Sequence, residues 1–197
     1  MADGSTFLIE ASDDNVIEIL GERTGSLDIR GKRNRVFIGE GAKFNGQIEI
    51  VGDDNLVEIG AWAVVNASCL RITTSGGEIL IGRAAAVVAS SLQVPEPSRI
   101  VIGDESGVGA ESWMTTSDMH PVYSLLTGLR INPARDIRLG KGVGGGFRCI
   151  YLKGSVIGDG AIIGAGSVVR GRIPANSLAS GNPVKVQRSG IRWAWNF

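Results

Sequence analysis

The chain has 197 residues, and its 20 Lys and Arg residues are balanced by 20 Asp and Glu residues, so its net charge at pH 7 is zero. This balance excludes the basic surface of a nucleic-acid-binding domain and the polybasic patch of a membrane-surface protein. No run of about 18 apolar residues predicts a membrane-spanning helix, and Met1–Thr6 has no signal-peptide pattern. We therefore expect one cytoplasmic domain over residues 1–197, with Cys69 and Cys149 reduced.

Glycine accounts for 29 residues, and several glycines follow an aliphatic residue at a regular interval. These pairs are Ile38–Gly39, Ile59–Gly60, Ile81–Gly82, Ile102–Gly103, Leu139–Gly140, Ile157–Gly158 and Ile163–Gly164. The first four glycines lie 21, 22 and 21 residues apart. We expect each aliphatic residue to point inward, and each glycine to turn a tight corner, often with a positive φ.

Toward the C-terminus the repeat shortens to six residues, with aliphatic side chains at Ile157, Ile163 and Val169. This period is neither that of a helix nor that of a single strand, and it indicates a parallel β-helix whose short strands stack in layers. Three sides of six residues make a coil of about 18 residues, so the longer N-terminal coils need extra residues. The turn formers Asp13–Asn15 and Asp53–Asn55 predict bulged corners that hold them.

The repeat is interrupted once. Inward positions run through Ile102, Val108 and Met114 to His120, and residues 121–138 then follow no period. An insertion that leaves a solenoid lies on the surface and often carries function. His120 stands where this protruding loop begins, and it is the single histidine of the chain. A C-terminal tail is expected over residues 187–197.

Three motifs around this interruption identify a resemblance: Ser117–Pro121 (SDMHP), Arg130–Ala134 (RINPA) and Gly181–Val186 (GNPVKV). Together with the six-residue repeats they resemble the hexapeptide-repeat acyltransferases, and most of all the sugar and capsular polysaccharide O-acetyltransferases, including the polysialic acid type. The resemblance implies an all-β fold, a left-handed parallel β-helix with one protruding loop, assembled as a homotrimer. It also implies an active site between subunits, acetyl-CoA as co-substrate and no metal.

The chemistry expected of His120 is general base catalysis. An imidazole can take the proton of a sugar hydroxyl that attacks a thioester, and it can return that proton to the leaving thiolate. Without its flanking motif, the same histidine would be read as an ordinary packed or exposed residue. Asp118 either orients the imidazole or acts as a turn carboxylate. A single histidine and the lack of a Gly-x-Ser-x-Gly motif disfavour a serine nucleophile and a three-histidine metal site.

Of the remaining candidate residues, those for coenzyme A are implied by the same resemblance, and those for the sugar are chosen because they lie near His120 or on the loop. The expected coenzyme A contacts are Gly146, Phe147, Ala165, Arg170, Lys185 and Arg188, where the charged members are equally well explained as solvated surface groups. The expected sugar contacts are Trp113, Asp118, Tyr123, Arg130 and Arg135. Trp113 is more readily a wall or interface residue, and Trp193 and Trp195 suggest tail packing or a trimer contact.

The chain departs from the family pattern at Gly144–Gly146. Gly144 stands where relatives carry a tryptophan that helps to form the acetyl-CoA site, and Gly145 occupies an inward aliphatic position. The loss would cost about 2–4 kcal/mol unless Phe147 or Tyr151 refills the space. It suggests either a larger acyl group or acceptor, or weakened activity. Three readings therefore stay open: an O-acetyltransferase, an N-acyltransferase for an amino-sugar nucleotide, and a non-enzymatic scaffold.

Overall fold

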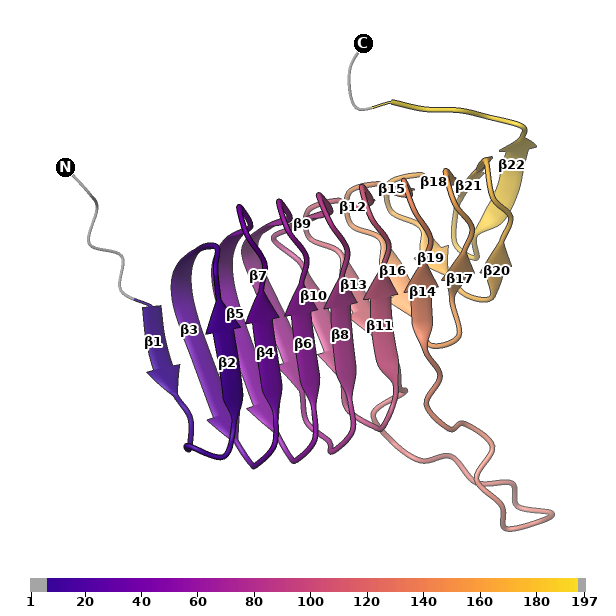
Figure 1. Ribbon diagram of the computed structural model, residues 1–197. Helices are drawn as coiled ribbons and strands as arrows, with labels where there is room; N and C mark the ends of the chain where they lie inside the picture. The colour runs from indigo at the N-terminus through magenta and orange to yellow at the C-terminus, as the bar shows by residue number, and fades with distance from the viewer. Residues whose placement is uncertain (1–6, 195–197) are drawn as a thin grey trace.

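The computed structural model describes residues 7–194, and all regular secondary structure in this range is β-strand. The chain winds into a three-sided solenoid (Figure 1). The first face is an eight-stranded parallel sheet. Its strands are β2 (Val16–Ile19), β4 (Arg35–Ile38), β6 (Leu56–Ile59), β8 (Glu78–Ile81), β11 (Arg99–Ile102), β14 (Ile137–Leu139), β17 (Val156–Ile157) and β20 (Arg172–Ile173).

The other two faces form one 14-stranded sheet, because long strands cross the corner between them in the N-terminal coils. These are β3 (Glu22–Arg30), β5 (Lys43–Val51) and β7 (Val64–Ile72), preceded by β1 (Phe7–Glu10). Later coils divide the same path. The second face holds β9 (Ala86–Val88), β12 (Gly107–Val108), β15 (Gly144–Gly145), β18 (Ile162–Ile163) and β21 (Ser177–Ser180), and the third holds β10 (Ser91–Val94), β13 (Trp113–Thr115), β16 (Ile150–Leu152) and β19 (Val168–Val169).

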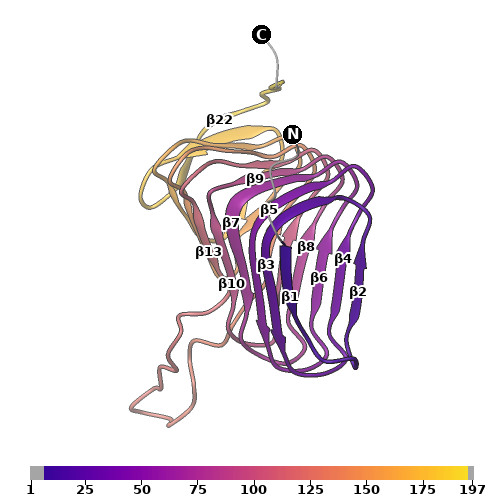
Figure 2. The same ribbon diagram turned by 90° about the vertical axis from the view of Figure 1, so that its left-hand side faces the viewer.

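Successive coils are parallel, and the solenoid ends in one antiparallel strand, β22 (Lys185–Ser189), which pairs with β21. Figure 2 looks at the solenoid from its N-terminal end. The chain rises along the first face on the right, crosses over the top to the left, and descends there as it recedes from the viewer. This winding is left-handed. The predicted all-β parallel helix is therefore confirmed, together with its hand.

The aliphatic residues of the repeat form a stacked column inside the first face. Register pairing joins them coil by coil: Ile38, Ile59, Ile81, Ile102, Leu139, Ile157 and Ile173. Each is at most 3% exposed, and burial of one such side chain contributes about 1.5–3 kcal/mol. The inward orientation predicted from the sequence is thus confirmed.

The predicted role of the glycine that follows each aliphatic residue is wrong in one respect. Gly39, Gly60 and Gly82 are absent from the residues with positive φ, and the left-handed position comes two residues later, at Gly41 and Trp62. Glycine is needed for close approach instead. A Cβ on Gly82 would lie 2.5 Å from the amide nitrogen of Asp104 in the next coil, a distance at which the two coils could not stack.

The bulged corners of the N-terminal coils contain a ladder of asparagine side chains. Asn34 Nδ2 donates to Asn15 Oδ1 at 3.0 Å, and Asn55 Nδ2 donates to Asn34 Oδ1 at 2.9 Å. Asn55 Oδ1 then accepts from the Gly77 amide at 2.7 Å. Asn34 and Asn55 are buried at 0% and 1% exposure, so the ladder satisfies backbone groups that water cannot reach.

Replacing Asn55 with alanine should lower the free energy of unfolding by about 1–3 kcal/mol, because the buried Gly77 amide loses its acceptor. Denaturant unfolding monitored by circular dichroism measures this change. Asn45→Ala is the matched control, since Asn45 donates to Asn66 in an exposed pair that should contribute little. Equal effects of the two substitutions would contradict the role assigned to the buried ladder.

The protruding loop leaves the solenoid after β13 and re-enters at β14. It projects well beyond the coils (Figures 1 and 2). Its apolar tip residues Leu125 and Leu126 are 105% and 93% exposed. Among residues 7–194, no helix is long and apolar enough to span a membrane.

Candidate active site

His120 lies at the root of the protruding loop, directly after a buried turn. Thr116 and Ser117 are buried at the end of β13. Met119 then adopts the left-handed conformation with φ of 68°, and its amide donates to Ser117 Oγ at 3.0 Å. This left-handed residue turns the chain outward, so the His120 side chain is exposed at the start of the loop.

An ion pair anchors the returning strand of the loop to the solenoid. Arg130 Nη1 and Nη2 donate to the two carboxylate oxygens of Glu96 at 2.6 and 2.8 Å. Ser117 Oγ also donates to Glu96. The hydrogen bonds from Arg130 and then from Ser117 lower the pKa of Glu96. The carboxylate therefore stays ionised down to acidic pH, and Arg130 is engaged in holding the loop.

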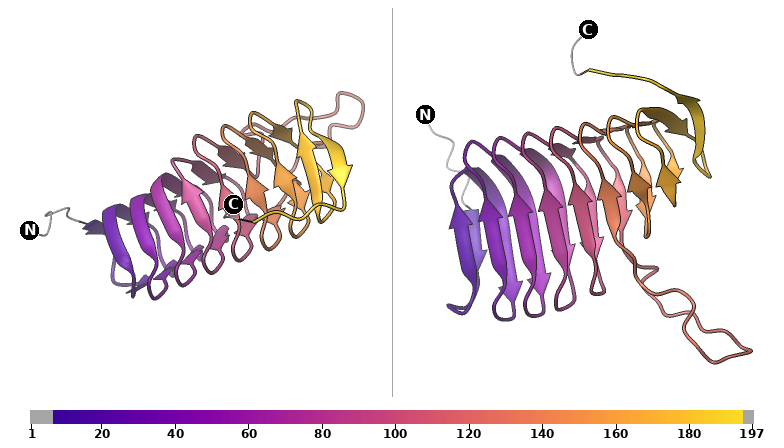
Figure 3. Two further views of the ribbon diagram at one scale, coloured as in Figure 1. Left: turned by 90° about the horizontal axis from the view of Figure 1, so that it is seen from above. Right: turned by 45° about the vertical axis from the view of Figure 1, so that its right-hand side comes forward.

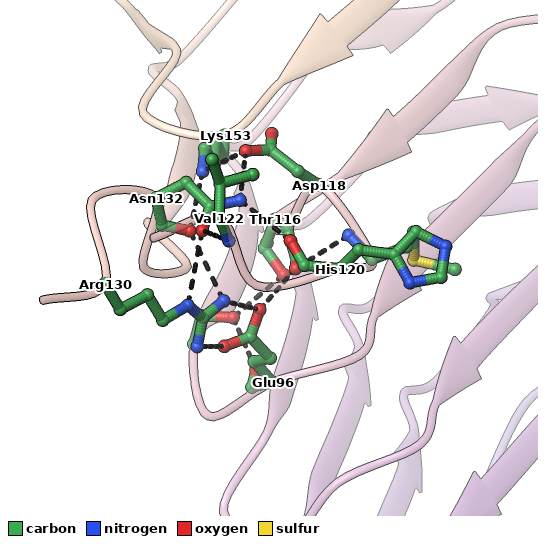
Figure 4. A network of polar contacts seen from close by, with 11 residues as sticks. Glu96, Thr116, Asp118, His120, Val122, Arg130, Asn132 and Lys153 are labelled. Carbon is green, nitrogen blue, oxygen red and sulfur yellow. Dashed lines mark hydrogen bonds and ion pairs between the residues drawn. The ribbon is translucent and has the colours of Figure 1, made fainter. Parts of the chain in front are cut away.

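A second cluster joins the two strands of the loop at its root (Figure 4). Asn132 Nδ2 donates to Asp118 Oδ2 and to the His120 carbonyl oxygen, both at 2.8 Å. Asn132 Oδ1 accepts from the Val122 amide at 2.6 Å. Lys153 Nζ donates to Asp118 Oδ2 at 2.6 Å and to the Asn132 carbonyl oxygen at 2.9 Å. The backbone on either side of His120 is thus held in place.

Asp118 is committed to this cluster. The hydrogen bond from Lys153 is the largest cause, and that from Asn132 the next, of a lowered pKa at Asp118. The imidazole of His120 points away from the carboxylate, while the His120 carbonyl faces the cluster (Figure 4). Of the two roles open for Asp118, this geometry corresponds to the turn carboxylate.

A cationic pocket of about 230 Å³ lies beneath the loop root. Its charged lining residues are Asp118, Arg135, Lys153 and Arg170. The Arg135 side chain crosses Gly154, with its Cδ 3.4 Å from the position of a Gly154 Cβ. Since Lys153 is paired with Asp118, the two guanidinium groups give the pocket an excess of positive charge. It therefore brings together Arg135, expected at the sugar, and Arg170, expected at coenzyme A.

The aromatic candidates lie apart from this pocket. Trp113 is half-buried on β13 and borders a shallow hollow of the third face with Ser91 and Cys69. Tyr123 is 57% exposed and forms an isolated backbone bridge with Arg130 inside the loop.

Three coenzyme A candidates are neighbours on successive coils, at the edge between the second and third faces. The Gly146 amide donates to the Ile163 carbonyl at 2.8 Å, and Phe147 accepts from the Gly166 amide at 2.8 Å. A Cβ on Gly146 would lie 2.5 Å from the Ala165 nitrogen. Phe147 is 43% exposed, with the Arg148 guanidinium 4.6 Å from its ring centroid. An exposed aromatic ring and a glycine backbone thus line this edge.

The remaining coenzyme A candidates, Lys185 and Arg188, are exposed on β22. Gly146 follows β15 on the second face, whereas His120 follows β13 of an earlier coil and lies beyond the far edge of the third face. The third face therefore separates the two predicted halves of the site within one chain.

Each glycine of Gly144–Gly146 has a structural reason. A Cβ on Gly144 would lie 3.2 Å from Cζ2 of Trp193, and one on Gly145 would lie 2.6 Å from the Tyr151 hydroxyl. The sequence left open whether Phe147 or Tyr151 refills the inward space beside Gly145. Tyr151 is fully buried and fills it, whereas Phe147 is exposed and does not. Trp195 lies outside the described residues.

Sequence reasoning missed Glu96, Asn132 and Lys153 as parts of this region, whereas the tail packing suggested for Trp193 is found, with its indole on Gly142 and Gly144. Asn132 could have been predicted from the sequence, because it belongs to the RINPA motif. Glu96 and Lys153 carry no local signal, since their partners Arg130 and Asp118 are 34 and 35 residues away.

Comparison with family models gives no match. Among curated proteins, the chain is 27% identical over 123 residues to a polysialic acid O-acetyltransferase of Escherichia coli O1:K1, a stretch that covers 62% of this chain and 40% of the relative. It is 28% identical over 141 residues to a polysialic acid O-acetyltransferase of Neisseria meningitidis, covering 65% of this chain and 60% of the relative. The chain thus matches less than two thirds of the length of either relative.

Two solved structures superpose on nearly the whole chain. The polysialic acid O-acetyltransferase OatWY superposes with a TM-score of 0.89 at 22% identity, covering 98% of this chain and 92% of the other. The polySia-specific acetyltransferase NeuO superposes with a TM-score of 0.85 at 24% identity, covering 98% and 84%. The fold is therefore that of these hexapeptide-repeat acetyltransferases. The resemblance predicted from the motifs, which includes the polysialic acid type of O-acetyltransferase, is confirmed.

Proposed function

We propose that this protein is an O-acetyltransferase that moves an acetyl group from acetyl-CoA to a hydroxyl of an acidic surface polysaccharide. The observation that carries the proposal is the rigid placement of the single histidine. It stands at a loop root held by Asn132 and Lys153, and the side of this root away from the imidazole borders a pocket lined by Arg135 and Arg170. The curated relatives and solved structures with the same fold support acetyl transfer, and excess positive charge suits the carboxylates of an acidic sugar.

In this mechanism His120 acts as the general base. Its imidazole takes the proton of the acceptor hydroxyl as the oxygen attacks the carbonyl carbon of the thioester. The tetrahedral intermediate collapses with cleavage of the carbon–sulfur bond, and the imidazolium returns the proton to the departing thiolate. The acetyl group passes directly to the sugar, with no acyl-enzyme. Asn132 acts on the backbone by fixing the His120 carbonyl, so the imidazole starts from a defined position.

The coenzyme A arm is placed along the edge formed by Gly146, Phe147 and Ala165. Glycine backbone and an exposed ring suit an uncharged pantetheine chain. The cationic side chains Lys185 and Arg188 of β22 are available to the nucleotide phosphates.

A homotrimer completes this proposal, because His120 and Gly146 lie on opposite sides of the third face in one chain. A neighbouring copy would bring a histidine to each coenzyme A edge. The fully exposed Leu125 and Leu126 at the loop tip support such a contact, since exposed apolar groups of this kind mark association surfaces. Sedimentation of the protein as a monomer would count against it. We also propose a cytoplasmic location, in keeping with the free thiols of Cys69 and Cys149.

The proposed function is tested with acetyl-CoA and a panel of acceptors. Sialic acid oligomers and other acidic saccharides are compared with neutral oligosaccharides and amino-sugar nucleotides, with thiol release as the readout and mass spectrometry of the product. We expect thiol release and O-acetylated product with an acidic saccharide. Product with an amino-sugar nucleotide alone would indicate the N-acyltransferase instead.

A further inference from the structure

The C-terminal tail turns back over the solenoid after β22. Figure 3 shows it leaving this strand and running along the coils toward their N-terminal side. The Ile191 amide donates to the Asn176 carbonyl at 2.9 Å. Two residues later, Trp193 Nε1 donates to the Gly142 carbonyl oxygen at 2.8 Å. These two hydrogen bonds fasten the tail to coils that precede it by many residues.

Trp193 lies directly on the backbone of Gly144. Its Cζ2 and Cε2 atoms are 3.2 and 3.3 Å from where a Gly144 Cβ would stand, and the Ile162 side chain is next to them. Even an alanine at position 144 would require the indole to shift by a few tenths of an ångström, and a bulky side chain there would collide with it. Gly144 stands where relatives carry a tryptophan, and in this chain the indole of Trp193 from the tail packs against it.

Trp193 and the glycines border a shallow, open apolar hollow of about 240 Å³. Its lining consists of Gly144, Gly145, Gly146, Ile162, Ile163 and Trp193. None of these side chains is charged, so the hollow suits an uncharged ligand with an apolar end. It reaches Gly146, where the proposed edge for the pantetheine arm begins.

We propose that Trp193 forms the aromatic wall of the pocket for the thioester and its acyl group, in place of a side chain at position 144. This inference rests on the proposed function, because it takes the ligand to be an acyl-CoA. The indole is held by its hydrogen bond to the Gly142 carbonyl, with Cζ2 and Cε2 over Gly144, and in this position it borders the hollow. The wall is carried by the tail, and its contribution can be removed without altering a coil.

The test compares Trp193→Ala with Trp62→Ala as a matched control. Trp62 is exposed, whereas Trp193 is half-buried. Trp62 also lies on a glycine, with its Cε3 2.4 Å from the position of a Gly41 Cβ, but it does not line the hollow. Calorimetry gives the dissociation constant of acetyl-CoA, and steady-state kinetics give KM for acetyl-CoA and for the acceptor. We expect Trp193→Ala to raise the dissociation constant and KM of acetyl-CoA roughly three- to tenfold, the range of one aromatic contact. Trp62→Ala should change neither.

A double substitution distinguishes a ligand-binding role of Trp193 from a purely structural role in holding the tail. Gly144→Trp alone should destabilise the protein, because the new side chain meets Trp193. Gly144→Trp combined with Trp193→Ala should bind acetyl-CoA more tightly than Trp193→Ala alone. The inference is overturned if folded Trp193→Ala binds acetyl-CoA as the Trp62 control does, or if the paired variant regains no affinity. Wild-type protein that binds acetyl-CoA but acetylates no saccharide would contradict the proposed function while leaving the wall intact.

Discussion

Replacing His120 with alanine is expected to lower kcat/KM for acetyl transfer by about 10²- to 10⁴-fold, the usual contribution of a positioned general base. No second histidine exists in the chain to take over the proton. The lysine nearest the loop root, Lys153, is bound to Asp118 and to the Asn132 carbonyl. The acceptor hydroxyl would then have to lose its proton to water.

The same substitution should leave the fold unchanged. The His120 side chain is exposed, and Asn132 bonds to the main-chain carbonyl of His120, which alanine retains. Thermal unfolding should therefore give the wild-type midpoint, and acetyl-CoA should bind with unchanged affinity. Turnover close to that of the wild type in a folded His120→Ala protein would refute the role of the imidazole as base.

The repeat could be predicted from the sequence because each coil carries its own inward aliphatic residues at a regular spacing. One inward aliphatic residue per side is enough to specify a stacked column, and the column through Ile59, Ile81 and Ile102 follows directly. The role of the next glycine was harder to predict. Whether a glycine supplies a left-handed turn or close approach depends on the coil stacked beside it, which the linear pattern does not describe.

The candidate site could be predicted only in part, for a similar reason. His120 was found because it ends a run of periodic positions. The anchors that hold it are contacts between coils on either side of an insertion, as in Glu96 with Arg130. Such pairs follow no period, and several other acidic residues could serve equally well on sequence grounds. Trp193 is an extreme case, since it reaches Gly142 from 51 residues away.

The glycine triplet illustrates what a sequence pattern leaves open. The pattern shows which side chains are missing, but not what occupies their space. In the structure an indole lies over Gly144 and a phenol fills the space beside Gly145. The triplet therefore gives no support to a degraded site, and the scaffold reading that relied on it loses its basis.

Tyr151 yields the largest expected effects on stability, and they have opposite signs. Its side chain is fully buried, and among residues 7–194 its hydroxyl is the one buried side-chain polar atom without a nitrogen or oxygen partner. The neighbouring Cys149 thiol is only a weakly bonding group. Tyr151→Ala would leave a cavity where Gly145 supplies no side chain, and should lower the free energy of unfolding by about 3–5 kcal/mol. Tyr151→Phe keeps the ring and removes the unsatisfied hydroxyl, so it should raise that free energy by about 1 kcal/mol.

Alkaline pH should widen the difference between wild type and Tyr151→Phe. Burial is the main cause that raises the pKa of Tyr151 far above its usual 10.0. Above about pH 10 the unfolded chain loses this proton while the folded chain keeps it, so the wild type loses stability as pH rises. The phenylalanine variant lacks that loss. Denaturant midpoints of the two proteins at neutral and alkaline pH measure the effect. A Tyr151→Phe protein less stable than wild type would mean that the hydroxyl has a partner in solution, such as a buried water.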